Sequence, residues 1–254
     1  MSNDKTAFDV SLGKAASGFT KLLRELGADG KQVIEMLDDD PAYASLVSLY
    51  MQSGCYSPST DQKRARDIMG SNFLGVEDII KHFGISLTDD EVSLLRDIRF
   101  TEAQLQECKD THVLFPGYPL SILEIRDRVP NAMFYSQDWY NDEKFTKKEK
   151  VGLHWYLIRK DIVENSTSKT YQEQTALLTS NEEVPRACEV IYLIMLYFLA
   201  YQKRLFEKVY ARCSNLSSDG NRVDVGNFDA KGLYVYSNWD DYRLVYLGVS
   251  SRRK

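Results

Sequence analysis

The residues best suited to chemistry lie in one short loop, Asn165-Ser166-Thr167-Ser168-Lys169-Thr170. The loop follows a predicted strand and enters a predicted helix through a capping box, Thr170 to Glu173. A helix N-terminus offers unpaired N–H groups and the positive end of a dipole, and both favour anions. Basic and hydroxyl side chains add charge-assisted hydrogen bonds. The loop therefore predicts a site for a phosphate or carboxylate, with these ligand residues: Arg159, Lys160, Asn165, Ser166, Ser168 and Lys169.

The same spacing also fits a capped loop with a purely structural role. In that case Ser166 and Ser168 bond to their own backbone and leave no opening for a ligand. The glycine pattern of a P-loop is absent from the segment. Both interpretations stay open at this stage.

A second kind of chemistry would use the histidines. No GxSxG or HExxH motif accompanies them, but a triad is assembled in space rather than in sequence. The rival hypothesis is therefore a hydrolase or transferase in which His112 or His154 meets Asp240 or Asp241. Neighbouring residues of a strand point to opposite faces, so the two aspartates favour capping or pairing with an arginine over joint catalysis.

The cysteines and acidic residues predict neither a metal site nor a cofactor. The cysteines lie far apart without a CxxC pair, whereas structural zinc takes closely spaced ligands. Asp219-Gly220-Asn221 is a hairpin-turn signal whose spacing does not fit a calcium loop. Reduced, buried thiols are typical of a cytoplasmic protein. The four cysteines are Cys55, Cys108, Cys188 and Cys213.

Charge argues against a nucleic-acid partner. The 254-residue chain carries a net charge of −5, whereas nucleic-acid binders present a basic face to the phosphates. The segment 76–98 has the outline of a helix-turn-helix, but its second helix begins Asp89-Asp90-Glu91. These carboxylates would be repelled in a DNA groove. We expect no duplex DNA binding and interpret the segment as a helical packing unit.

One apolar segment, Ala187–Tyr201, invites comparison with a membrane span. It contains a glutamate and is shorter than the roughly 20 residues that a spanning helix needs. Since it is apolar all round, we predict one continuous buried helix from Pro185 to Glu207. The start of the chain is polar, without an apolar signal core, so we expect no membrane association and a cytoplasmic location.

Periodicity and turn signals divide the chain into three parts. Residues 1–57 are predicted to be a helical region, 58–110 a three-helix region with capping boxes at Thr88 and Thr101, and 111–254 an α+β domain. Strands are predicted at 112–115, 122–125, 133–135 and 153–158, and a β-meander follows Lys208. The predicted fold is α+β, with a helical N-terminal region followed by an antiparallel sheet packed on the buried helix.

Five short sequence segments together resemble a group of uncharacterised bacterial proteins of similar length. The resemblance extends from about residue 65 to the end and implies a bacterial, cytoplasmic setting but no activity and no site residues. The segments are Met69-Gly-Ser-Asn-Phe-Leu-Gly-Val-Glu77, Cys108-Lys-Asp-Thr-His-Val-Leu114, Leu120-Ser-Ile-Leu-Glu-Ile-Arg126, Asn165-Ser-Thr-Ser-Lys-Thr170 and Ser237-Asn-Trp-Asp-Asp241.

These observations favour a non-enzymatic binding or interaction protein. Its expected partner is an unknown protein or a small anionic ligand, and the loop 165–170 is the expected anion site.

Overall fold

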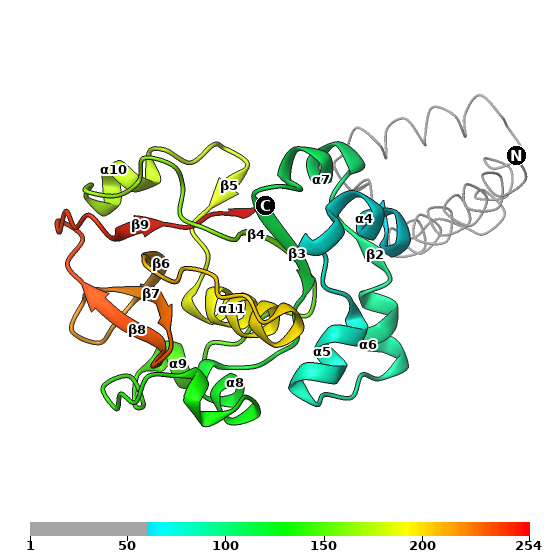
Figure 1. Ribbon diagram of the computed structural model, residues 1–254, viewed down its shortest axis with the longest axis horizontal. Coiled ribbons are helices and arrows are strands. Elements are labelled where there is room, and N and C mark those ends of the chain that lie inside the picture. The colour runs from blue at the N-terminus through cyan, green and yellow to red at the C-terminus, as the bar shows by residue number, and fades with distance from the viewer. Residues whose placement is uncertain (1–59) are drawn as a thin grey trace, which may run out of the picture. The chain divides into compact units, whose positions relative to one another are not determined.

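The computed structural model describes residues 60–254, in which helices and mostly antiparallel strands form the predicted α+β fold. The helical region predicted for residues 1–57 lies outside the described residues. Within them, two four-stranded sheets pack around a central helix, α11 (Ala187–Tyr201) (Figure 1).

Helix α11 is the centre of the core because it is apolar on every side. All residues from Ala187 to Phe198 are buried, as predicted. The predicted bounds Pro185–Glu207 are wrong, since the helix ends at Gln202, which takes a left-handed conformation with φ 55°. Beyond this turn Leu205 and Phe206 pack back into the core. Among the described residues, none of the helices combines the length and apolar character needed to cross a membrane.

The first sheet has the strand order β3-β4-β10-β5, and every neighbouring pair in it is antiparallel. Strand β3 is buried along its whole length, and Phe115 stacks on Tyr192 of α11 at 5.8 Å between ring centroids. The predicted strands at 112–115 and 153–158 are therefore confirmed. The strands are β3 (His112–Pro116), β4 (Trp155–Arg159), β5 (Glu182–Glu183) and β10 (Arg252–Arg253).

Between residue 60 and this sheet the chain contains four α-helices, one more than the three predicted for 58–110. Thr88 and Thr101 form the predicted capping boxes with Glu91 and Gln104. Helix α6 buries none of its side chains. The buried side chains of this segment are Ile79 and Phe83 of α5, and Leu95 and Ile98 after α6. The elements are β1 (Thr60–Asp61), α4 (Gln62–Met69), the 3-10 helix η1 (Gly70–Asn72), α5 (Val76–Phe83), α6 (Asp89–Leu94), β2 (Asp97–Ile98) and α7 (Glu102–Cys108).

The strand predicted at 122–125 is wrong: this segment is helix α8 (Ile122–Arg128). Ser121 and Glu124 form a capping box that starts a helix, and Ile122 and Ile125 are buried at helical spacing. The segment predicted as a strand at 133–135 follows a 3-10 helix, and Phe134 makes only an isolated bridge to Leu233. These elements are η2 (Asn131–Met133) and, in the loop after it, α9 (Lys144–Lys147).

The second sheet has the order β8-β7-β6-β9 and contains the predicted meander. The hairpin turn at Gly220, with φ 84°, joins β6 to β7 as predicted. Strand β9 pairs in parallel with β6, which the sequence pattern did not indicate. The strands are β6 (Tyr210–Leu216), β7 (Arg222–Asp229), β8 (Gly232–Asn238) and β9 (Leu247–Val249). Helix α10 (Tyr171–Thr175) precedes them in the chain.

Candidate functional site

The predicted loop 165–170 lies beside the second sheet, and Ser166 anchors it there. Ser166 is fully buried, and its hydroxyl oxygen accepts a hydrogen bond from the Val249 N–H at 3.2 Å. The Gln174 amide donates to the carbonyls of Ser166 and Leu247 at 2.8 and 2.9 Å. Ser166 therefore fastens the loop to β9, and its hydroxyl does not face a ligand.

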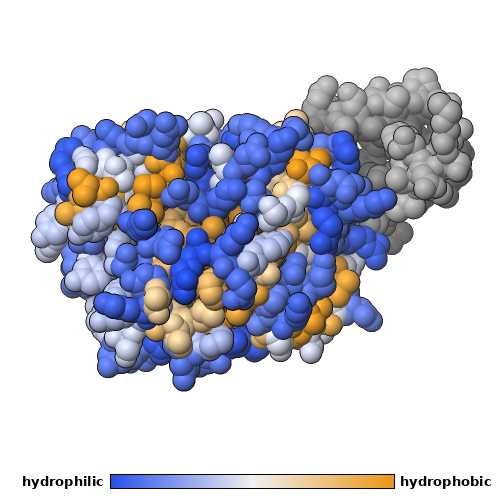
Figure 2. All heavy atoms as spheres, in the orientation of Figure 1, coloured by the Kyte–Doolittle hydropathy of each residue, from blue (hydrophilic) through white to orange (hydrophobic). Residues whose placement is uncertain are grey.

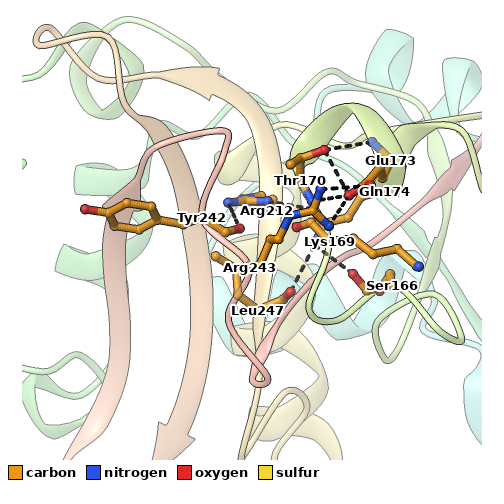
Figure 3. Close-up of polar contacts among 9 residues, drawn as sticks. All are labelled: Ser166, Lys169, Thr170, Glu173, Gln174, Arg212, Tyr242, Arg243 and Leu247. Atoms are coloured by element: carbon orange, nitrogen blue, oxygen red, sulfur yellow. Dashed lines mark hydrogen bonds and ion pairs between the residues drawn. The ribbon is translucent and has the colours of Figure 1, made fainter.

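Arg212 of β6 holds the segments around it together through its hydrogen bonds, and we call this set of contacts the Arg212 brace (Figure 3). Its side chain is fully buried and donates to the Lys169 carbonyl at 3.2 Å and to Gln174 Oε1 at 3.1 Å. The same guanidinium donates to the carbonyls of Trp239 and Tyr242 at 2.8 and 2.9 Å. One buried arginine thus joins the loop before α10 to the loop after β8.

The N-terminus of α10 is already occupied by the chain itself. The Thr170 N–H donates to the Glu173 carboxylate at 2.8 Å, and the Glu173 N–H donates to the Thr170 hydroxyl at 3.3 Å. The Tyr171 N–H donates to the Asp240 carbonyl at 2.8 Å. The backbone hydrogen bond from Thr170, aided by Arg243, lowers the pKa of Glu173 to about 2. An internal carboxylate therefore already caps this five-residue helix, and an external anion would compete with it.

A hollow of about 450 Å³ lies on the other side of the loop. It includes four of the six predicted ligand residues, Arg159, Lys160, Asn165 and Ser166, and does not include Ser168 or Lys169. The Lys169 ammonium extends away from the contacts of the Arg212 brace (Figure 3). The remaining lining residues are Asp110, Thr111, Asp161, Ile162, Val163, Glu164 and Thr167.

Arg159 is the less committed of the two cations in the hollow. Within residues 60–254 its guanidinium has neither a hydrogen bond nor an ion pair, and the side chain is half-buried. Lys160 Nζ lies 3.3 Å from Asn72 Oδ1 and keeps capacity for further bonds. Three carboxylates share the lining with these two cations, so the hollow is mixed in charge rather than basic.

The histidines of the rival hypothesis do not meet the aspartates. His112 is buried, its Nδ1 lies 2.8 Å from the Thr111 hydroxyl, and burial with help from Arg159 lowers its pKa to about 3. His154 Nδ1 lies 3.0 Å from the Trp155 carbonyl. In the described part of the chain, neither histidine makes a hydrogen bond to a carboxylate.

Of the two aspartates predicted to pair with an arginine or cap a helix, Asp240 pairs with Arg222. Asp240 accepts two hydrogen bonds from Arg222, each at 3.0 Å, which is the bidentate geometry that favours arginine over lysine. Asp241 is exposed. Asp240 therefore links the loop between β8 and β9 to strand β7.

Sequence reasoning missed Arg212 and Asp224, which are paired across β6 and β7. Asp224 is buried, and desolvation raises its pKa to about 7, although a hydrogen bond from Asn238 opposes this. One of its oxygens has no partner among the described residues. The segments that contain Lys169, Trp239 and Tyr242 fold over Arg212, and all three residues are far from it in the sequence.

No protein-family model, curated protein or solved structure matches the chain. The resemblance to bacterial proteins of similar length therefore stays a prediction. Within residues 60–254, no three side chains of the metal-binding types gather closely enough to hold an ion.

Proposed function

We propose that this chain is a non-enzymatic binding protein whose hollow takes a small molecule through an anionic group. The observation that carries the proposal is the uncommitted, half-buried Arg159 guanidinium in a hollow of about 450 Å³. This volume lies in the range of small-molecule sites. An arginine without an internal partner can give two parallel hydrogen bonds to a carboxylate or phosphate.

The other charges of the hollow narrow the ligand class. Asp110, Asp161 and Glu164 line it together with Arg159 and Lys160. The Asp161 carboxylate accepts a hydrogen bond from the Ile162 N–H at 2.8 Å. A bare anion would be repelled by the carboxylates, whereas a molecule with an anionic and a cationic group would pair with both signs. A zwitterion is therefore the proposed ligand.

The hydrolase or transferase hypothesis gains no support from these contacts. It requires a histidine hydrogen-bonded to a carboxylate, and His112 bonds to a threonine hydroxyl instead. Its depressed pKa is explained by burial in the first sheet. We favour binding over catalysis for this reason.

A cytoplasmic setting is part of the proposal. Cys108, Cys188 and Cys213 are buried and unpaired in the described part of the chain. Burial raises the pKa of Cys188 to about 12, so its thiol stays protonated and inert. Such thiols are typical of reducing compartments.

The test is a calorimetric titration of the full chain with O-phosphoethanolamine, which joins a phosphate to an ammonium group. We expect saturable binding, weakened about tenfold or more by Arg159→Gln, since a charged hydrogen bond is worth about 1.5 to 3 kcal/mol. Inorganic phosphate should bind more weakly than the zwitterion. Lys231→Gln removes the same charge outside the hollow and should leave binding unchanged. Equal loss in both variants would contradict the proposal, because it would indicate diffuse charge attraction.

A further inference from the structure

The loop from Trp239 to Tyr246, which joins β8 to β9, displays an unusual concentration of large apolar side chains. We call it the aromatic loop. The exposed fractions are 57% for Trp239, 47% for Tyr242, 78% for Val245 and 45% for Tyr246. Single exposed apolar residues are ordinary on protein surfaces, but four of them within one eight-residue loop make it a candidate interaction site. Figure 2 shows apolar side chains in separate groups among hydrophilic ones on the face that it presents.

The backbone of the aromatic loop is held in place from beneath. Arg212 donates hydrogen bonds to the carbonyls of Trp239 and Tyr242. The Ser168 N–H donates to the Leu244 carbonyl at 3.0 Å. The Tyr210 N–H donates to the Tyr246 carbonyl at 2.8 Å.

These contacts fix the backbone and leave the rings exposed. In Figure 3 the ring of Tyr242 points away from the network while its carbonyl faces Arg212. A loop that is already ordered loses little conformational entropy on binding, and tryptophan and tyrosine supply rigid contact area. The aromatic loop is therefore built for recognition.

The charges of the aromatic loop indicate the kind of partner. Its cation is engaged, because Arg243 pairs with Glu173 at 2.8 Å. Asp240 is held by Arg222 at 3.0 Å. Asp241 is exposed and has no ion pair within residues 60–254, which leaves one negative charge uncompensated beside the rings. The faces of aromatic rings also carry negative potential, so rings and carboxylate together favour a cation.

We propose that the aromatic loop docks a basic peptide segment of a partner protein. Lysine or arginine side chains of that segment lie over the rings of Trp239 and Tyr242, and one of them pairs with Asp241. The net charge of −5 for the whole chain adds a long-range attraction for the same partner. This surface is separate from the hollow, since none of its residues lines it.

The test is a calorimetric titration of the full chain with a nonapeptide of arginine, against a glycine–serine nonapeptide, at low and physiological salt. We expect binding of the basic peptide alone. Trp239→Ala should weaken it about tenfold and Asp241→Asn about threefold, from the cation–π and ion-pair contributions. Trp239→Phe should retain part of the affinity. Trp239 accepts the hydrogen bond from Arg212 through its backbone carbonyl, so Trp239→Ala and Trp239→Phe should keep the wild-type melting temperature.

The matched control is Asp89→Asn in the acidic first turn of α6, which has no aromatic neighbour in its helix. It should bind as the wild type does. Equal weakening by Asp89→Asn and Asp241→Asn would overturn the proposal in favour of diffuse attraction. Binding that persists in Trp239→Ala would overturn it as well. So would sedimentation showing a self-associated chain that Trp239→Ala dissociates, because the occupant would then be a second copy.

Discussion

The two sheets share helix α11 but differ in what lies on their strands. Strand β3 of the first sheet is buried throughout, and its Phe115 stacks on both Tyr156 and Tyr192. In the second sheet two charged residues, Arg212 and Asp224, are buried as well, and Arg212 donates to carbonyls of the loops on either side of it. Both sheets therefore have apolar packing, which in the second includes Val223, Val225 and Val235, and the second sheet adds a hydrogen-bonded network around Arg212. The network is what orders the aromatic loop.

The largest expected effect is at the shared helix. Ile194 is completely buried, and Ile194→Asp places an unpaired charge in the core at a cost of several kcal/mol, on the order of the whole folding stability. We expect loss of the folded state by circular dichroism. Val92→Asp, at a side chain 46% exposed on α6, is the control and should fold normally. A folded Ile194→Asp protein with unchanged melting temperature would refute the central place of α11.

The next effect separates the two sheets. Arg212→Met keeps an unbranched, flexible side chain but removes the donor of the Lys169 and Tyr242 carbonyls, while the Trp239 carbonyl keeps its bond from the Tyr242 N–H at 3.1 Å. Each buried polar group left without a partner costs about 1 to 3 kcal/mol. Hydrogen exchange should accelerate in 165–175 and 239–246 and stay slow in β3. Equal acceleration of hydrogen exchange in both sheets would show that the contacts of Arg212 stabilise the whole fold rather than these two segments.

Opposite responses to pH are expected from His112 and Asp224. The pKa of folded His112 lies near 3, below its unfolded value, so its contribution is complete above about pH 6.5 and is lost as pH falls toward 3. The pKa of folded Asp224 lies near 7, above its unfolded value, so its contribution is present below about pH 4 and is lost as pH rises through 7.

Asp224→Asn should therefore raise stability at pH 8 by about 2 to 4 kcal/mol and leave it nearly unchanged at pH 4, because asparagine resembles the protonated acid. His112→Gln should reduce the loss of stability below pH 6. Urea unfolding across this pH range measures both. A gain at pH 4 equal to the gain at pH 8 would rule out ionisation as the cause.

The smallest effect distinguishes the two predicted serine ligands. Ser166→Ala removes the acceptor of a buried Val249 N–H and should cost about 1 to 3 kcal/mol. Ser168 is exposed, and Ser168→Ala should be neutral in thermal unfolding. If both variants retain O-phosphoethanolamine binding, the predicted role of the serines as ligands is excluded. If Ser168→Ala alone loses it, the site lies at α10 rather than in the hollow.

Local signals in the sequence predicted much of the fold. The capping boxes at Thr88, Thr101 and Thr170, the turn at Gly220 and the burial of α11 follow from short-range chemistry. The same chemistry overrode a strand-like pattern at α8, where Ser121 and Glu124 start a helix.

The long-range features could not be predicted in this way. Arg212 is buried only because loops separated from it by about 40 and 30 residues fold over it. The parallel pairing of β9 with β6 depends on a similar return of the chain. The loop 165–170 was found from its hydroxyls and its cap, and in the structure the Glu173 carboxylate of this cap already bonds to the N-terminus of α10. Asn165, Ser166 and Thr167 of this loop line the hollow together with Arg159 at the end of β4.

The most direct test of the binding proposal is a crystal structure of the full chain soaked in O-phosphoethanolamine. We predict the phosphate within hydrogen-bond distance of the Arg159 guanidinium and the ammonium group beside Asp110, Asp161 or Glu164. An empty hollow at saturating ligand, or a phosphate bound to Lys169 outside it, would contradict the proposal.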